Sequence, residues 1–160
     1  MTQEDWITDP DWQTIVKHVP IVSVDLVVFH EDAVLLAKRE NEPAKGQWFV
    51  PGGRVLKNET REEAVHRVAK QELGVAVDII ESIGAYEHIY ETADVDVENG
   101  KHYLANGYVV RPRENNFDLD SQHSAAKFFE SPPNELHEFI AAYFSDAEAL
   151  ERWWEAGVKK

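Results

Sequence analysis

The sequence contains no cysteine. A disulfide framework, a thiolate nucleophile and a cysteine-based zinc site are therefore excluded. Long hydrophobic runs are also missing, because the longest nearly apolar stretch, residues 20–29, is interrupted by Ser23 and Asp25. The first residues, MTQEDW, lack the basic segment and apolar core of a signal peptide. We therefore expect no membrane span, no secretion signal and a cytoplasmic location.

Positive charge is scarce as well. Lysine and arginine number 16 against 30 acidic residues, which gives a formal net charge of −14. Nucleic-acid backbones are bound by clustered lysine and arginine, so no general nucleic-acid surface is expected. A phosphate-bearing ligand must then be held locally by a metal ion and a few arginines. The acidic excess is most simply a solubilising surface.

The chain is long enough for one core: 160 residues with 43% apolar and 11% aromatic side chains, and without a repeat or a linker. We expect a single domain spanning residues 1–160 and a mixed α/β (α+β) fold. The expected elements are a helix opened by Asp9-Pro10, strands at 21–29, 33–38, 48–50, 75–90, 102–111 and 125–129, a helix at 135–144, and a helix opened by a capping box at 145–148 and ended by Gly157.

A further helix is predicted between a capping box formed by Thr60 and Glu63 and a stop at Gly74. Glu72 lies in the middle of its apolar arc, where a carboxylate is costly unless it meets a cation or a metal. One interpretation is that Glu72 bends to water or pairs with Arg67 or Lys38. A second interpretation, that Glu72 binds a metal ion, is favoured by the upstream Gly-rich segment at 51–53. Glycines allow the backbone to approach a ligand, and one carboxylate with main-chain carbonyl and phosphate oxygens suits Mg²⁺.

The segment GGRVLKNETREEAVHRVAKQELGV, residues 52–75, resembles the Nudix box of nucleoside diphosphate hydrolases. The family positions, which span 53–75 here, are occupied with full spacing by Gly53, Glu59, Arg67, Glu72, Gly74 and Val75. Two positions depart from the pattern, since Val68 and Gln71 stand where the family usually has glutamates that bind metal or activate water. The resemblance implies the Nudix fold, a mixed β-sheet sandwiched between helices.

One branch of the family, the GDP-mannose mannosyl hydrolases, shares these departures. The resemblance to it extends over DWQTIVKHVPIVSVD (11–25), LLAKRENEPAKGQWFVPGGRV (35–55), EHIY (87–90), HY (102–103) and DSQH (120–123). It implies a metal site for Mg²⁺ or Mn²⁺ made by the Gly52 main-chain carbonyl, the Glu72 carboxylate and the Gln122 side-chain carbonyl. His123 would then be the general base.

Other matching positions imply contacts with a nucleoside diphosphate sugar. These are Trp12 for stacking on guanine, Asp25 and Arg39 for contacts that cross a homodimer interface, Arg54 and Tyr103 for the diphosphate, and His88 and Tyr90 for the sugar. Arg39 and Arg54 would also neutralise the charge that develops on a diphosphate leaving group. Water activated by a histidine would attack the anomeric carbon and release GDP from GDP-mannose or GDP-glucose.

Plainer interpretations stand beside these. His123 alone is a loop histidine, Trp12 shares helical spacing with core residues, and Asp25 alternates in phase with Ser23 in a way that marks an outer sheet face. Arg67 is also expected to pair with Glu63 one helical turn earlier. Two rival functions remain open: a pyrophosphatase that attacks phosphorus in a nucleotide sugar or ADP-ribose, and a non-catalytic domain that binds a nucleotide sugar.

Overall fold

The computed structural model describes residues 7–117, 126–134 and 136–158. Its centre is a mixed sheet with the main strand order β3-β2-β1-β6-β5, in which β4 pairs with β1 and β7 pairs with β2. The strands are β1 (Ile21–His30), β2 (Ala33–Lys38), β3 (Trp48–Phe49), β4 (Gly52–Arg54), β5 (Val77–Tyr90), β6 (Lys101–Pro112) and β7 (Ala126–Phe129). β1 runs parallel to β6 and antiparallel to β2 and β4.

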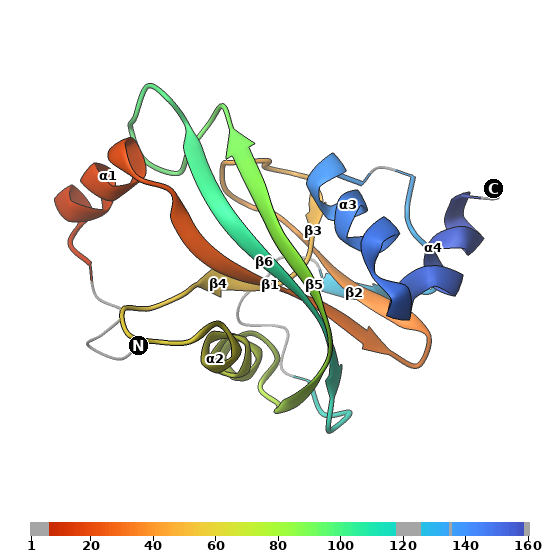
Figure 1. Cartoon of the computed structure of the whole chain (residues 1–160). Coiled ribbons are helices and arrows are strands. Elements are labelled where there is room, and N and C mark those ends of the chain that lie inside the picture. The colour runs from red at the N-terminus through yellow and green to blue at the C-terminus, as the bar shows by residue number, and fades with distance from the viewer. Residues whose placement is uncertain (1–6, 118–125, 135, 159–160) are drawn as a thin grey trace.

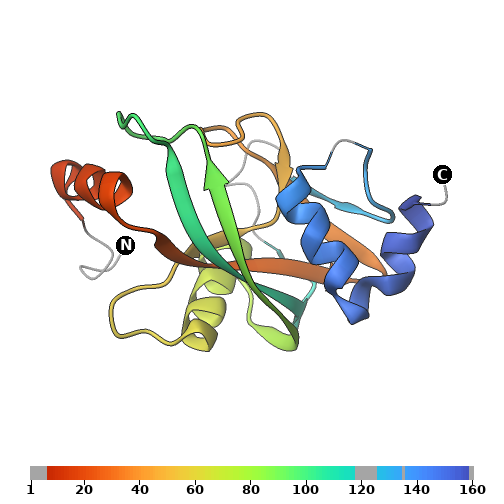
Figure 2. The same ribbon diagram turned by 45° about the horizontal axis from the view of Figure 1, so that its top comes forward.

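Helices cover both faces of the sheet (Figure 1). They are α1 (Asp9–His18), α2 (Arg61–Leu73), α3 (Glu138–Asp146) and α4 (Glu151–Val158), with a 3₁₀ turn, η2 (Glu148–Leu150), between the last two. α2 lies on one side and α3 on the other, whereas α1 lies at the opposite end of the molecule from α3 and α4 (Figures 1 and 2). The predicted fold class, a mixed sheet between helices, is therefore confirmed. In the part of the chain that is described, no helix is long and apolar enough to cross a membrane.

The alternation of side chains along β1 divides the core in two. Val24, Leu26 and Val28 are buried against α2, whereas Val27 on the opposite face is buried with residues of α3 and α4. A strand whose two faces are both covered is apolar almost throughout, which accounts for the nearly continuous apolar stretch in the sequence. Asp25 is in phase with Val27, so it points to the α3 side.

The predicted ends of α2 are confirmed by its caps. The Thr60 hydroxyl accepts a hydrogen bond from the Glu63 amide at 3.1 Å, and Gly74 ends the helix in the left-handed conformation with φ 73°. Only the glycine adopts this conformation without a steric cost from a Cβ atom. The spacing of polar caps around an apolar arc was therefore sufficient to define this helix.

The predicted capping box at 145–148 is wrong. Ser145 and Asp146 belong to α3, and the chain leaves the helix at Ala147. The Glu81 carboxylate of β5 accepts hydrogen bonds from the amides of Glu148 and Ala149 at 3.0 and 2.9 Å, so a partner distant in sequence replaces the expected local cap. The predicted stop at Gly157 is also wrong, because Gly157 lies within α4. A Cβ there would come within 2.6 Å of Pro132.

Candidate active site

A cavity of about 300 Å³ opens beside β1, β4, β5 and β6. Its lining includes the residues predicted to contact substrate, together with one predicted metal ligand: Trp12, Asp25, Arg39, Gly52, Arg54, His88, Tyr90 and Tyr103. These residues come from segments that are far apart in the sequence, and the sheet brings them together. Sequence reasoning did not single out Ser23 or Phe49, which also line the cavity.

A second cavity, of about 230 Å³, adjoins the first one. Glu72 lines it, and Arg39 and Gly52 line both cavities. Glu72 and Gly52 therefore border the same space, although Glu72 belongs to the apolar arc of α2. Of the predicted catalytic group, Gln122 and His123 lie outside the described residues.

Residues 51–53 were predicted to form a Gly-rich loop after a strand, but Gly52 and Gly53 begin the short strand β4, which extends to Arg54. Ser23, Val24 and Asp25 of β1 pair with Arg54, Gly53 and Gly52. A Cβ at Gly52 would collide with the Asp25 carboxylate, and one at Gly53 would come within 2.9 Å of the Val68 side chain. Glycine is required at both positions because β4 packs tightly between β1 and α2.

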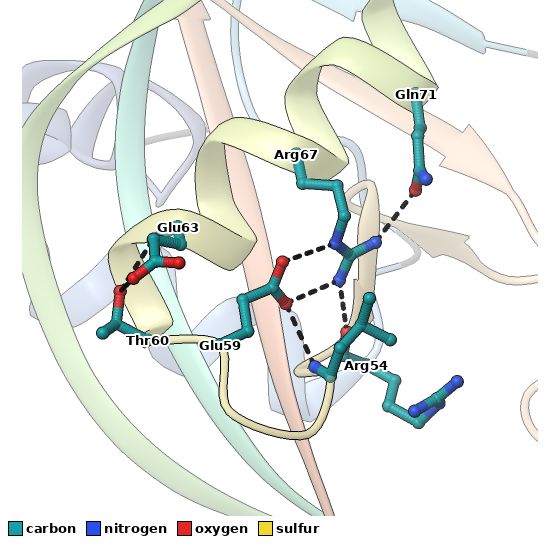
Figure 3. Close-up of polar contacts among 7 residues, drawn as sticks. Arg54, Glu59, Thr60, Glu63, Arg67 and Gln71 are labelled. Atoms are coloured by element: carbon teal, nitrogen blue, oxygen red, sulfur yellow. Dashed lines mark hydrogen bonds and ion pairs between the residues drawn. The ribbon is translucent and has the colours of Figure 1, made fainter. Parts of the chain in front are cut away.

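Polar contacts tie α2 to the segment before it (Figure 3). The Arg67 guanidinium donates to Glu59 Oε2 at 2.7 Å and Oε1 at 3.0 Å, and to the Arg54 carbonyl at 2.7 Å. Glu59 Oε1 also accepts from the Leu56 amide at 3.0 Å. The expected pairing of Arg67 with Glu63 is therefore wrong, because Glu59 reaches Arg67 from the loop while the Glu63 carboxylate accepts from the Thr60 hydroxyl.

The two departures from the family pattern have clear structural roles. Val68 is buried and fills the space over Gly53. Gln71 is exposed and accepts a hydrogen bond from Arg67 at 3.0 Å. Among residues 7–117, 126–134 and 136–158, no three histidine, aspartate or glutamate side chains gather as a metal site. The donors that remain, one carboxylate on α2 and the carbonyl of Gly52, fit a metal bound largely by neutral oxygens and substrate phosphates.

Asp25 lies inside the main cavity, so the interpretation that it marks an outer face is wrong. Its Oδ2 accepts a hydrogen bond from the Tyr143 hydroxyl of α3 at 2.7 Å. Burial raises the pKa of Asp25 to about 6, although the Tyr143 hydrogen bond and the nearby Arg39 charge oppose this rise. Arg39 is itself held by a hydrogen bond from its Nε to the Pro43 carbonyl at 2.7 Å. Tyr143 was not predicted, because nothing local distinguishes it from other apolar positions of its helix.

His88 is buried, with 3% of its surface exposed, and its ring stacks on Phe139 at 4.6 Å between centroids. Its Nε2 has no hydrogen-bond partner among the described residues. Burial, with a smaller effect from His137, lowers the pKa of His88 to about 4. His88 is therefore a neutral ring on the cavity wall, and its Nε2 has hydrogen-bonding capacity that the described residues leave unused. His137 contacts the rings of Tyr90 and Phe139.

Trp12 lines the cavity, whereas Val16 of the same helix is buried in the protein. The Lys101 ammonium lies 5.1 Å from the centroid of the Trp12 ring and 5.0 Å from that of Tyr103. Lys101 is only 5% exposed and forms an ion pair with Asp94 at 2.9 Å. Sequence reasoning missed this lysine, because a single lysine at a strand start gives no signal of burial.

Comparison with known proteins agrees with this architecture. Residues 19–153 match the NUDIX domain family, and the chain belongs to that family. It is 52% identical over 137 residues to "Low-salt glycan biosynthesis protein Agl8" of Haloferax volcanii, a match that covers 86% of this chain and 88% of that protein. It is 42% identical over 67 residues to "ADP-ribose pyrophosphatase" of Methanocaldococcus jannaschii, which covers 42% of this chain and 40% of that protein.

Solved structures give the same result for the fold. The crystal structure of a MutT NUDIX hydrolase from Burkholderia pseudomallei superposes with a TM-score of 0.61 at 27% identity, covering 80% of this chain and 98% of that one. A NUDIX-family hydrolase from Clostridium perfringens gives a TM-score of 0.62 at 18% identity, covering 82% of this chain and 96% of that one, and this likeness concerns the fold alone.

Proposed function

We propose that this Nudix protein is a Mg²⁺-dependent hydrolase of a nucleoside diphosphate sugar, and that water attacks the anomeric carbon to release a nucleoside diphosphate and free sugar. The observation that carries the proposal is the shared cavity, in which an aromatic ring, two arginines, a carboxylate and a neutral histidine face the same space. These groups match the parts of such a substrate: a base, a diphosphate and a polyhydroxylated ring. GDP-mannose, or GDP-glucose, is the proposed substrate.

The diphosphate would lie where the two cavities meet. Arg39 lines both cavities and Arg54 lines the main one, so both guanidiniums are placed to bind phosphate oxygens. Gly52, Glu72 and Gln122 would hold Mg²⁺, with Mn²⁺ as a substitute, and the metal supplies charge neutralisation of the diphosphate when it is bound. With this charge neutralised, the leaving group requires no separate protein acid.

The base is proposed to be His123 because α2 has no carboxylate at positions 68 and 71, where the family usually has glutamates. Val68 is buried against Gly53, and Gln71 is an amide engaged by Arg67, so neither takes a proton from water. A histidine near neutral pH does so. Asp25 and His88 would orient the sugar, since Asp25 accepts hydrogen bonds from hydroxyl groups and the His88 Nε2 has no partner among the described residues.

The relatives support this assignment in part. The protein named for glycan biosynthesis covers most of the chain, and its name is consistent with sugar-nucleotide chemistry. The relative named ADP-ribose pyrophosphatase favours the alternative, attack on phosphorus to give a nucleoside monophosphate, but it matches less than half of the chain. A non-catalytic binding domain is the third alternative. Glu72 beside Gly52 argues against it, because a domain that only binds needs no carboxylate at the diphosphate.

Product analysis in labelled water tests the reaction. With GDP-mannose and Mg²⁺, we expect GDP and free mannose, initially the inverted β-anomer, because a single displacement enters opposite the leaving group. Reaction in ¹⁸O-labelled water should place the label in the sugar. GMP with mannose 1-phosphate, or label in a phosphate, would establish attack on phosphorus. Binding without any product would establish the non-catalytic alternative.

His123→Gln tests the base separately. The expected loss in kcat is roughly 10²–10⁴-fold with little change in substrate affinity, the usual range for removal of a general base. His66→Gln, on the exposed side of α2, is the matched control and should keep wild-type kcat. Equal kcat values for wild type and His123→Gln would show that another group takes the proton.

The domain organisation, the cellular location and the oligomeric state are also proposals. A single domain spanning residues 1–160, acting in the cytoplasm as a homodimer, is the organisation that the resemblance implies. Analytical ultracentrifugation of the full chain measures the oligomeric state, and a monomer at working concentration would remove the dimer from the proposal.

A further inference from the structure

A buried lysine stands behind the aromatic wall of the cavity. Lys101 begins β6, is 5% exposed, and holds its ammonium 2.9 Å from Asp94 Oδ1. The same ammonium lies 5.1 Å from the Trp12 ring centroid and 5.0 Å from the Tyr103 ring centroid. Removing an ammonium group from water is costly unless it is paired. Here one carboxylate and two aromatic rings replace the water.

The positions of the Tyr103 and Trp12 rings should depend on Lys101 to different degrees. Tyr103 belongs to the same strand, so the backbone hydrogen bonds of β6 to β1 and β5 already place it. Trp12 belongs to α1, which lies at the end of the molecule (Figure 1). A cation near its ring therefore contributes more to the position of Trp12 than to that of Tyr103.

The loop that carries Asp94, residues 91–100, also contacts α1 directly. Gln13 Nε2 donates to the Asp96 carbonyl at 2.6 Å, and Asn99 Nδ2 donates to the Lys17 carbonyl at 3.2 Å. The loop lies between α1 and the loop after β2 in Figure 2. It is tied to the latter loop by the Thr92 hydroxyl, which donates to Glu42 Oε2 at 2.8 Å. Two walls of the cavity, one with Trp12 and one with Arg39, are thus joined by one loop.

We propose that Lys101, held by Asp94, is a positioning residue that fixes the Trp12 ring as the stacking platform for the nucleobase of the ligand. The inference rests on the proposed function only in that the ligand is a nucleotide. Lys101 acts through Trp12 and makes no contact of its own with the ligand. Its removal should therefore weaken binding of the base and leave binding of the diphosphate unchanged.

Calorimetry with GDP and with inorganic pyrophosphate, both with Mg²⁺, separates these two contributions. The variant is Lys101→Met, which keeps an unbranched chain and removes the charge. We expect the Kd for GDP to rise roughly 3- to 30-fold, the range of a cation–π contact from partly exposed to desolvated, while the Kd for pyrophosphate stays at the wild-type value. Lys127→Met is the matched control, because Lys127 lies over the rings of Trp48 and Phe129, which do not line the main cavity.

A double-mutant cycle distinguishes positioning from a general structural effect. In a Trp12→Ala background, Lys101→Met should cause no further loss of GDP affinity, since the ring on which it acts is gone. Additive losses, equal weakening of GDP and pyrophosphate, or an unchanged Kd for GDP in Lys101→Met would each overturn the inference. If Lys101→Met does not fold, Asp94→Asn gives the same test, with a smaller rise in the Kd for GDP and none for pyrophosphate.

A failure of the proposed reaction can be distinguished from a failure of the role inferred for Lys101. If the wild type hydrolyses no nucleotide sugar but binds GDP in a manner that depends on Trp12 and Lys101, the reaction is wrong and the positioning role stands. If Trp12→Ala binds GDP like the wild type, the stacking platform itself is wrong, and the role of Lys101 is overturned with it.

Discussion

On the α2 side of the sheet, polar side chains satisfy one another: Arg67 binds Glu59, the Arg54 carbonyl and Gln71 in one connected group. On the α3 side, the cavity holds Asp25 and His88, whose pKa values burial displaces in the directions that disfavour charge. Mutually paired groups stabilise a fold, whereas enclosed groups with displaced pKa values are typical of sites that await a ligand. The polar contacts of the Nudix box thus hold α2 to the segment before it, and Glu72 is the residue of the box to which the proposed function gives a metal-binding role.

The largest expected effect is a loss of turnover when Glu72, on the α2 side, is substituted. If Glu72 binds the metal as proposed, Glu72→Gln should fold and lose roughly 10²-fold or more of the Mg²⁺-dependent turnover, because it removes the proposed charged ligand while keeping its volume. Steady-state kinetics over a series of Mg²⁺ concentrations measures the loss. Glu62→Gln, an exposed position on the same helix, is the control and should behave as wild type. Full activity of Glu72→Gln at ordinary Mg²⁺ concentrations would remove Glu72 from the metal site.

Substitutions in the Arg67 and Glu59 group should lower the free energy of unfolding and leave turnover nearly unchanged. Glu59→Gln leaves the Arg67 cation without its carboxylate, and because both side chains are mostly buried we expect a loss of about 1.5–3 kcal/mol in the free energy of unfolding. The kcat of the folded protein should change little. Asp78→Asn, in the exposed pair with Arg113, should cost only about 0–1 kcal/mol in the same denaturation experiment. A large fall in kcat with unchanged stability would place Glu59 in the chemistry.

On the α3 side, His88 should make the stability of the protein depend on pH. Its folded pKa of about 4 lies below the ordinary value of 6.5, so the unfolded chain binds the proton more readily and this residue lowers stability as pH falls from about 6.5 to 4. Urea unfolding at pH 7.5 and pH 5 should show that His88→Phe reduces the difference between the two free energies by about 1–2 kcal/mol. His66→Gln, an exposed histidine, should leave the difference unchanged. The same pH dependence in wild type and His88→Phe would contradict a neutral buried ring.

The two sides also differ in how far the sequence predicts them. Thr60, Glu63 and Gly74 define α2 through contacts within a few residues, so the helix was found from its pattern. The start of η2 was missed because its cap, the Glu81 carboxylate, arrives from a distant strand. Tyr143 and Lys101 were missed for the same reason, since their partners are remote in sequence. The resemblance supplied the cavity residues one by one, and the structure shows that the sheet brings them together around one cavity.

Tyr143 gives the smallest and most selective test. Its hydroxyl, 2.7 Å from Asp25 Oδ2, occupies one carboxylate oxygen, and its buried ring packs edge-on against Tyr86 at 4.8 Å between centroids. Tyr143→Phe keeps the ring and removes only the hydroxyl, so packing on the α3 side should persist. We expect kcat to fall about 3- to 10-fold, a loss that corresponds to about one hydrogen bond, because Asp25 loses the hydrogen bond that would orient it toward the proposed sugar. Tyr86→Phe removes a hydroxyl that donates to Asp146 and should keep wild-type kcat. If both variants reduce kcat equally, the effect is one of packing, whereas a loss confined to Tyr143→Phe shows that α3 contributes to the site on the opposite side of the sheet from α2.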